Sequence, residues 1–170
     1  KREYKAALCS ALGWIKDEAA LEALLEAFED RDWQVRARAL EAVRKIDAPK
    51  ASGIVAEAAK DKTYQVRMKA AEYWPAIDKA AAAAGMGVLA KDEDWRVRFA
   101  VIEATKDLRM REGIGWLVEL LGTEKGRLRW DVLVALTDLT GKDLGLNPKN
   151  WASWWQFNKD TFKVLPKKGQ

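Results

Sequence analysis

Histidine is absent from the 170-residue sequence, and cysteine occurs only once. Without histidine the chain cannot build a Ser-His or Cys-His catalytic pair, a histidine-ligated zinc site or a histidine pH switch. The single Cys9 can form no disulfide within the chain, so we expect it to pack as a small core residue. Cysteine clusters, Gly-rich phosphate loops and nucleophile elbows are missing as well. The sequence therefore predicts no catalytic residue, no metal site and no cofactor.

Long hydrophobic runs are also lacking. The alanine tract from Ala80 to Ala84 is far shorter than the roughly 18–20 residues that cross a bilayer, so we expect no membrane partner. With 49% hydrophobic and 33% charged residues, the composition is that of a folded domain. The chain begins at Lys1 without a Met or a signal-peptide pattern. We therefore expect a portion of a longer protein, and its compartment stays open.

The net charge of +4 is concentrated at one end of the chain. Residues 141–170 contain six Lys and two Asp, which leaves 24 basic and 24 acidic residues before them. The body of the chain is thus neutral, which does not favour a stripe that follows a phosphate backbone. Nucleic acid is therefore the less expected partner, although binding through the C-terminal lysines stays an alternative.

A short motif recurs at a constant spacing. The strings DWQVR, TYQVR, DWRVR and KGRLR begin at Asp32, Thr63, Asp94 and Lys125, 31 residues apart each time. Apolar residues at three- and four-residue intervals give each repeat one stripe on a first helix and another on a second helix. The first three of these positions are suited to cap the first helices, since their side-chain oxygens can accept from free amides. Such a hairpin cannot bury its own stripes, so hairpins must stack. The sequence predicts an all-α fold, an α-solenoid of about five 31-residue hairpins.

The sequence resembles the HEAT-like repeat family, including the short repeats of phycobilin lyases, and KDEDWRVR from residue 91 to 98 is close to the family consensus. In that family an Asp before the first helix and an Arg six residues later form a ladder of ion pairs and hydrogen bonds between successive repeats. The resemblance implies this role for Asp30 with Arg36, Asp61 with Arg67, and Asp92 with Arg98. Because Thr123 precedes Arg129, we expect the ladder to end there.

The segments of the chain follow from this register. We expect an array over 1–140, with repeats near 1–29, 30–60, 61–91, 92–122 and, in part, 123–140. A helix beginning at Asn147 and Pro148 belongs to a different segment, 141–162. Its string TGxxxGxxPxxWxxWW resembles segments that close bacterial HEAT-like arrays, which implies that Trp151, Trp154 and Trp155 cap the last repeat. The tail 163–170 is expected to be poorly ordered.

The other tryptophans are interpreted mainly as packing residues. Trp33, Tyr64 and Trp95 share one repeat position and are expected to seal the joints between hairpins. Residues 14, 74 and 130 are tryptophans on first helices and are interpreted in the same way.

The resemblance also implies that the second helices line a concave face. Positions on that face outside the buried stripe are predicted to form a partner-binding groove, and they are Glu22, Glu26, Ile54, Glu57, Gly85, Val88, Glu112, Trp116 and Glu119. Ile54 and Trp116 would project as apolar anchors, while the glutamates would attract positive charge. The expected partner is a protein or peptide segment that is basic or amphipathic. An ordinary solvated face is the open alternative.

The leading hypothesis is a non-enzymatic scaffold that binds a protein or peptide and is monomeric as a module. One alternative is a nucleic-acid-binding or DNA-glycosylase-like HEAT protein, but the predicted groove is acidic, which argues against it. Another alternative is a structural spacer within a longer chain.

Overall fold

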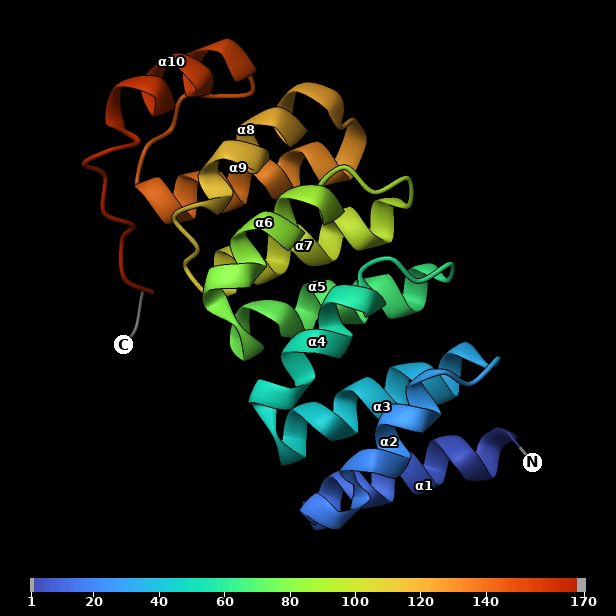
Figure 1. Cartoon of the computed structure of the whole chain (residues 1–170). Coiled ribbons are helices and arrows are strands. Elements are labelled where there is room, and N and C mark those ends of the chain that lie inside the picture. Colours follow the sequence, from blue (N-terminus) through green and yellow to red (C-terminus); the bar gives the residue numbers. More distant parts are fainter. Residues whose placement is uncertain (1, 168–170) are drawn as a thin grey trace. The chain divides into compact units, whose positions relative to one another are not determined.

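The computed structural model describes residues 2–167, apart from the side chains of Arg2, Ala48 and Lys79. Within these residues the chain forms ten α-helices, one short 3-10 helix and no strand (Figure 1). The elements are α1 (Arg2–Ile15), η1 (Glu18–Ala20), α2 (Leu21–Phe28), α3 (Trp33–Ile46), α4 (Ala48–Ala58), α5 (Tyr64–Ile77), α6 (Lys79–Leu89), α7 (Trp95–Asp107), α8 (Gly113–Thr123), α9 (Gly126–Thr140) and α10 (Pro148–Asn158). The predicted all-α solenoid fold is confirmed.

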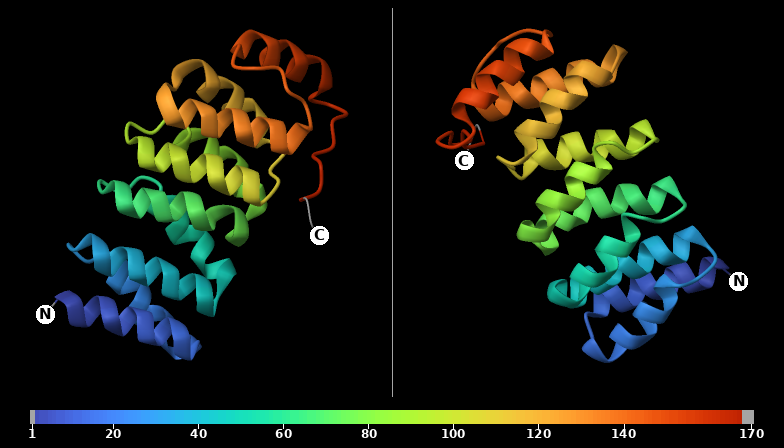
Figure 2. Two further views of the ribbon diagram at one scale, coloured as in Figure 1. Left: turned by 180° about the vertical axis from the view of Figure 1, so that it is seen from behind. Right: turned by 45° about the horizontal axis from the view of Figure 1, so that its top comes forward.

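The chain divides into two compact units, Lys1–Gly85 and Met86–Gln170, with the boundary inside α6. We call them unit 1 and unit 2. The first helices of the repeats are α1, α3 and α5 in unit 1 and α7 and α9 in unit 2. The second helices are α2, α4, α6 and α8. Figure 2 shows this alternation from two further directions.

Two of the three caps expected on the first helices are present. Asp32 accepts a hydrogen bond from the amide of Gln34 at 2.9 Å, and Asp94 does the same for Arg96 at 2.9 Å. Asp47 caps α4 by accepting from the amide of Lys50 at 3.1 Å. Thr63 differs from the expectation, because its side chain makes no capping bond to α5. Its hydroxyl oxygen instead accepts from Arg36 at 3.2 Å, so this side chain joins two repeats rather than capping one helix.

Unit 1 is built around α3, which packs against α1, α2, α4 and α5. The apolar stripe of α3 includes Val35 and Ala39, and both are fully buried. Close approach to α1 depends on Gly13, where a Cβ atom would lie only 2.8 Å from the Cα of Ala42. Cys9 is buried, as expected. The contact between α1 and α3 therefore depends on small and branched residues at the positions that the repeat predicts.

Unit 2 is built on contacts of α7 and α8 with α9, and of α10 with α8. Helix α9 ends at Gly141, which adopts the left-handed conformation (φ 69°) that favours glycine. Helix α10 begins at Asn147, which caps the amide of Lys149 at 3.1 Å, with proline as the first helical residue. This start was predicted from the sequence. Trp151 of α10 is fully buried, and its indole N–H donates to the carbonyl of Gly145 at 2.8 Å.

The segment after α10 differs from the expectation of a poorly ordered tail. The amide of Leu165 donates to the carbonyl of Leu139 at 3.1 Å, and Arg109 donates to the carbonyl of Leu165 at 2.7 Å. Arg111 similarly bonds the carbonyl of Phe162 at 2.9 Å. Backbone groups paired in this way hold residues 162–165 on unit 2. The last part of the expected tail, 168–170, lies outside the described residues, as does the start of the first repeat at Lys1.

The ladder is present in unit 1, where Arg36 links two repeats. Its guanidinium donates to both carboxylate oxygens of Asp61, at 2.6 and 2.7 Å, and to the carbonyl of Asp30 at 2.8 Å. Both side chains of the pair are only 8% exposed. Lys5 occupies the same repeat position in α1 and bonds the carboxylate of Asp30 at 2.6 Å. Arg67 repeats the backbone contact of Arg36, because it donates to the carbonyl of Asp61, six residues before it, at 2.8 Å.

The ladder in unit 2 extends one step further than the sequence predicted. Arg98 donates to the carbonyl of Asp92 at 2.7 Å and pairs with the carboxylate of Glu124, one residue beyond Thr123. A glutamate side chain is one methylene longer than an aspartate, so it can complete the pair from the neighbouring position. The next arginine, Arg129, donates to the carbonyl of Leu146 at 2.9 Å. The expectation that the ladder ends at Thr123 was therefore wrong.

Candidate functional site

The predicted groove residues fall into both units. In unit 1, Glu22 and Glu26 are exposed on α2, and Glu57 is exposed on α4. Ile54 is half-buried and does not project freely. Glu57 pairs with Lys60 at 3.1 Å on the same exposed surface, so part of its charge is already balanced. The remaining groove position of unit 1 is Gly85.

Gly85 was predicted to floor the groove, but it makes room for a core side chain instead. A Cβ atom at this position would lie 2.1 Å from the ring of Trp74, and no side chain could be accommodated there without a shift of that ring. Trp74 itself is only 7% exposed, in agreement with its interpretation as a packing residue. The glycine is therefore required by helix packing, not by a partner.

Trp116 in unit 2 corrects the prediction of an exposed anchor. Its side chain is 9% exposed, and its indole N–H donates to the hydroxyl of Thr105 at 3.1 Å. The ring lies against Gly87, where an added Cβ would be 3.7 Å away. Thr105 is a polar residue at a position that is apolar in the neighbouring repeats, and it supplies the acceptor that a buried indole needs. That polar residue was the sequence signal for burial of Trp116.

The remaining groove positions of unit 2 are exposed. Val88 on α6 has 71% of its surface exposed, and Glu112 lies just before α8. Glu119 on α8 pairs with Lys91 at 3.1 Å, with the two side chains 62% and 71% exposed. An ion pair this exposed is worth at most about 1 kcal/mol, so a competing charge can open it.

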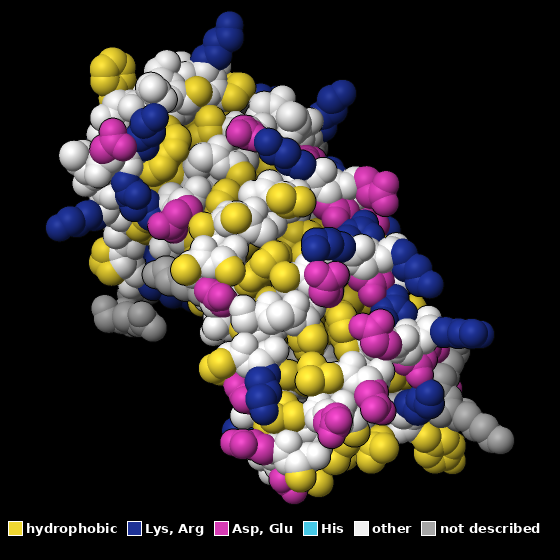
Figure 3. Space-filling model, in the orientation of Figure 1, with side chains coloured by type: hydrophobic (Ala, Val, Ile, Leu, Met, Phe, Trp, Pro, Cys, Tyr) yellow, Lys and Arg dark blue, Asp and Glu magenta, His cyan; other side chains and the backbone are white. Residues whose placement is uncertain are grey.

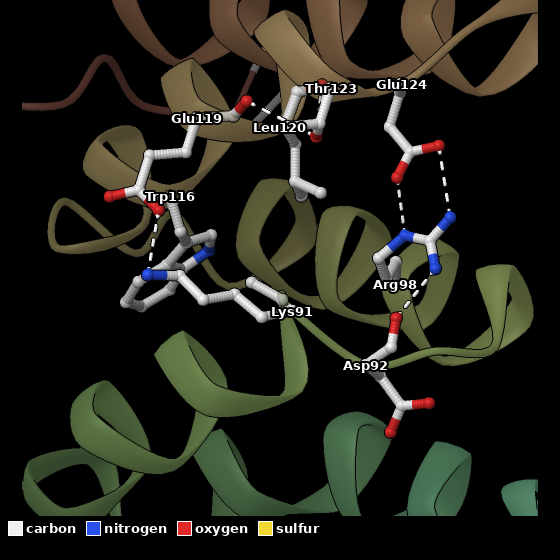
Figure 4. Close-up of a pocket in the computed structure, with 9 residues that line it drawn as sticks. Lys91, Asp92, Arg98, Trp116, Glu119, Leu120, Thr123 and Glu124 are labelled. Atoms are coloured by element: carbon white, nitrogen blue, oxygen red, sulfur yellow. Dashed lines mark hydrogen bonds and ion pairs between the residues drawn. The ribbon is translucent and has the colours of Figure 1, made fainter.

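A pocket of about 390 Å³ lies in unit 2 beside Trp116 and Glu119 (Figure 4). Trp116 and Leu120 provide its apolar surface. In Figure 4 the Lys91–Glu119 pair lies on the same side as Trp116, and Arg98 and Glu124 lie on the opposite side. Glu124 and Arg98 are 10% and 19% exposed, so the Arg98–Glu124 pair forms a rigid side of the pocket. The exposed Lys91–Glu119 pair can open more easily.

The charges around this pocket nearly balance. Two basic and three acidic side chains line it, which leaves a formal charge of −1. The structure thus brings together Trp116 and Glu119 from the predicted groove, but it does not bring Val88 or Glu112 to the pocket. Such a site can accept a side chain with an apolar stem and a cationic end, because the stem would contact Trp116 and the charge would replace that of Lys91.

Sequence reasoning missed a second and larger cavity, on the first helices of unit 1. A groove of about 570 Å³ runs across α1, α3 and α5, with Trp33 and Met68 among its apolar residues. It exists because Ala6 and Ala37 are small at a position that carries Met68, Phe99 and Trp130 in later repeats. Comparing side-chain size at this one repeat position would have found it.

The same position in unit 2 forms an exposed aromatic surface. Trp130 is 55% exposed and Phe99 is also exposed, and Trp95 is 55% exposed one turn before Phe99. The interpretation of Trp95 and Trp130 as sealing or packing residues was therefore wrong, as it was for Trp14, which is 74% exposed. More than half of the surface of each of these three tryptophans is therefore exposed to solvent.

Within residues 2–167, no group of three or more His, Cys, Asp or Glu side chains is arranged to hold a metal ion. In the same range no helix is both long and apolar enough to span a lipid bilayer.

A family model described as HEAT repeats matches residues 1–74, which lie within unit 1. Repeats of this kind commonly serve as scaffolds for protein interactions. No curated protein matches the chain.

Proposed function

We propose that this chain, whose residues 1–74 match the model of HEAT repeats, is a non-enzymatic scaffold that binds a segment of another protein or a peptide. The observation that carries the proposal is the pocket beside Trp116 in unit 2, which combines an apolar wall with one ion pair that opens easily. The partner segment is amphipathic and presents a Lys or Arg to Glu119. The pocket is rigid on the side of Arg98 and Glu124, so it can select the shape of that side chain.

The buried ring of Trp116 gives the pocket a rigid apolar surface. Because its indole is hydrogen-bonded to Thr105, the ring presents a fixed surface and loses little conformational entropy when a partner binds. A long aliphatic stem placed on that surface would bury apolar area, and each buried methylene would contribute about 0.8 kcal/mol. The charge at the end of the stem contributes mainly to specificity and to the rate of association.

A selection from a random peptide library tests this proposal. Peptides retained by the chain are expected to be enriched in Lys or Arg next to Leu, Phe or Met. Replacing Glu119 with Lys should weaken their binding about five- to tenfold at low salt, because attraction becomes repulsion at one exposed site. Binding is measured by fluorescence anisotropy of a labelled peptide.

Glu112→Lys is the matched control, since it makes the same change in charge at an exposed position outside the pocket. It should leave the affinity within about twofold, apart from the long-range effect that salt screens. Circular dichroism of both variants should equal that of the parent chain. Selected peptides that bind the Glu119→Lys and Glu112→Lys variants with the same affinity would show that the pocket is not the binding site.

A further inference from the structure

After α10 the chain forms no further helix over residues 162–167, which we call the surface segment. Figures 1 and 2 show it as an extended chain beside the last turn of α9 and the connection between α7 and α8. Leu165 of this segment is 43% exposed, whereas Trp151 in α10 is fully buried. In Figure 3 hydrophobic and basic side chains reach the surface next to each other around α10, at the upper left. The surface segment therefore has few buried contacts, which is typical of parts that open locally.

Unit 2 holds the surface segment mainly through its backbone. Arg109 donates to the carbonyl of Leu165 at 2.7 Å, and Arg111 donates to the carbonyl of Phe162 at 2.9 Å. The amide of Leu165 donates to the carbonyl of Leu139 at 3.1 Å. Leu139 lies in the last turn of α9, where carbonyl groups lack a partner within the helix. Any extended chain offers the same backbone groups, so these three contacts do not depend on the sequence of the segment.

Arg109 adopts a backbone conformation that favours glycine. Its φ is 53°, and it directly follows Leu108, the last capping residue of α7. The amide of Met110 donates to the carbonyl of Thr105 at 3.0 Å, the bond typical of a helix that a left-handed residue ends. A side chain at this position strains the backbone, so the turn itself does not explain an arginine. The guanidinium does explain it, because it pairs with the carboxylate of Asp138 and also bonds the surface segment.

Two side chains of the surface segment contact unit 2 closely. The ring of Phe162 meets the ring of Trp154 edge to face, with the centroids 5.1 Å apart. Leu165 lies against Gly141, where an added Cβ atom would be only 2.7 Å from the Cδ1 atom of the leucine. The missing side chain of Gly141 thus leaves the space that Leu165 fills. These contacts favour an aromatic residue followed three positions later by a leucine.

We propose that Arg109, Arg111 and the end of α9 form a docking site for an extended segment of a partner protein, with an aromatic residue and a leucine three positions later. The surface segment occupies this site within the chain and competes with the partner. Because few contacts hold it, it opens without unfolding of unit 2, and the partner segment takes its place. The site shares no residue with the pocket beside Trp116, so the inference does not depend on the function proposed for that pocket.

The test uses a labelled peptide with the sequence of residues 160–167 as the probe. In the 170-residue chain, Leu165→Pro removes the amide donor and the side chain that contacts Gly141, so this release variant should free the site. The peptide should bind the release variant at least about tenfold more tightly than the parent chain, where the attached segment competes at a high effective concentration. Fluorescence anisotropy measures both affinities. A peptide with the same Leu165→Pro change should bind neither chain.

Arg109→Gly, made in the release variant, locates the site. Glycine adopts a φ of 53° without strain, so this change removes the guanidinium and should preserve the fold, as circular dichroism checks. Binding of the peptide should be lost. Lys16→Gly in the release variant is the matched control, because Lys16 has a φ of 57° and lies in unit 1. It should leave the affinity unchanged.

Hydrogen exchange followed by NMR tests the parent chain without any variant. The amide of Leu165 should exchange at least about tenfold faster than the amide of Leu136, which is fully buried in α9. Equal exchange rates would mean that the surface segment opens only when unit 2 unfolds, and they would overturn the proposal. So would a peptide that does not bind the release variant, that binds the parent equally well, or that still binds after Arg109→Gly. Light scattering that shows a dimer lost on Leu165→Pro would also overturn it, by making a second copy the occupant.

Discussion

The two units use the same repeat register to make opposite surfaces. On the outer side of the first helices, unit 1 has Ala6 and Ala37 and therefore a groove, whereas unit 2 has Phe99 and Trp130 and therefore a ridge. The buried positions do not differ in this way, since Val35 and Val97 are both fully buried at the same repeat position. The comparison teaches that packing between hairpins fixes the inner positions, while the outer positions are free to carry different surfaces.

The strongest test of this distinction compares two tryptophans of unit 2. Trp151→Ala should destabilise the chain by about 4 kcal/mol, because it removes a fully buried ring and leaves the carbonyl of Gly145 without its donor. Trp130→Ala should cost less than about 1 kcal/mol, because more than half of that side chain is already exposed. Urea unfolding followed by circular dichroism measures both. Equal losses would mean that the outer ridge is part of the core.

Breaking the ladder should have the next largest effect. Arg36→Ala leaves Asp61 charged, nearly buried and without its main partner, so we expect a loss of about 3 kcal/mol. Arg98→Ala in unit 2 should cost less, because the side chain of Arg98 is 19% exposed and water can compensate in part. Hydrogen exchange read separately over residues 30–66 and 92–128 distinguishes the two. A larger effect for Arg98 would contradict the ranking.

Acid should weaken unit 1 by a smaller amount. Burial alone would raise the pKa of Asp61, but hydrogen bonds from Arg36 and from the amide of Thr63 outweigh it and lower the pKa below its usual value. The pKa of Asp30 is also lowered, first by the amide of Asp32 and then by Lys5. Because these folded-state pKa values are lowered, the stabilisation is complete above the unfolded value of about 4 and is lost as the pH falls through the folded values.

Thermal melting between pH 7 and pH 2.5 should therefore show a falling midpoint below about pH 4. In Asp61→Asn the midpoint should be lower at neutral pH and should change less on acidification, since one of the linked carboxyls is gone. A midpoint that rises as the pH falls would contradict this assignment.

A last comparison concerns two glycines of unit 1, and Gly53→Ala has the smallest expected effect. Gly53 has open space around the position of a Cβ, so Gly53→Ala should stabilise α4 by about 0.5–1 kcal/mol. Gly85→Ala should destabilise, because the new methyl group would overlap the ring of Trp74. Differential scanning calorimetry of the two variants checks the signs. Stabilisation by both would mean that Trp74 can move freely.

The sequence predicted the helices well because their cause is local and repeated. Apolar stripes, the caps at Asp32 and Asp94, and the start of α10 at Asn147 all depend on neighbours within a few residues. The sequence predicted a ladder between repeats, but it did not predict where the ladder ends. A pattern of identical spacing misses Glu124, which reaches Arg98 from one position later.

The candidate site was predicted less well because it depends on which large side chain fills which space. Trp116 and Gly85 share one repeat position, yet one buries its indole against Thr105 and the other makes room for Trp74. Neither pairing is visible from spacing alone, since each depends on a residue in the preceding first helix. The end-cap role of Trp151, Trp154 and Trp155 stays a prediction, although Trp154 and Trp155 do stack on each other and contact Phe162.

Asp61 has a consequence for how disturbances travel within unit 1. One of its carboxylate oxygens accepts from Arg36 of α3 and also from the amide of Thr63, which begins α5. If Arg36 moves away from Asp61, the first turn of α5 loses support directly, and the apolar core need not rearrange first. Stretching or partial melting at one hairpin would be felt at the next through a single carboxyl group.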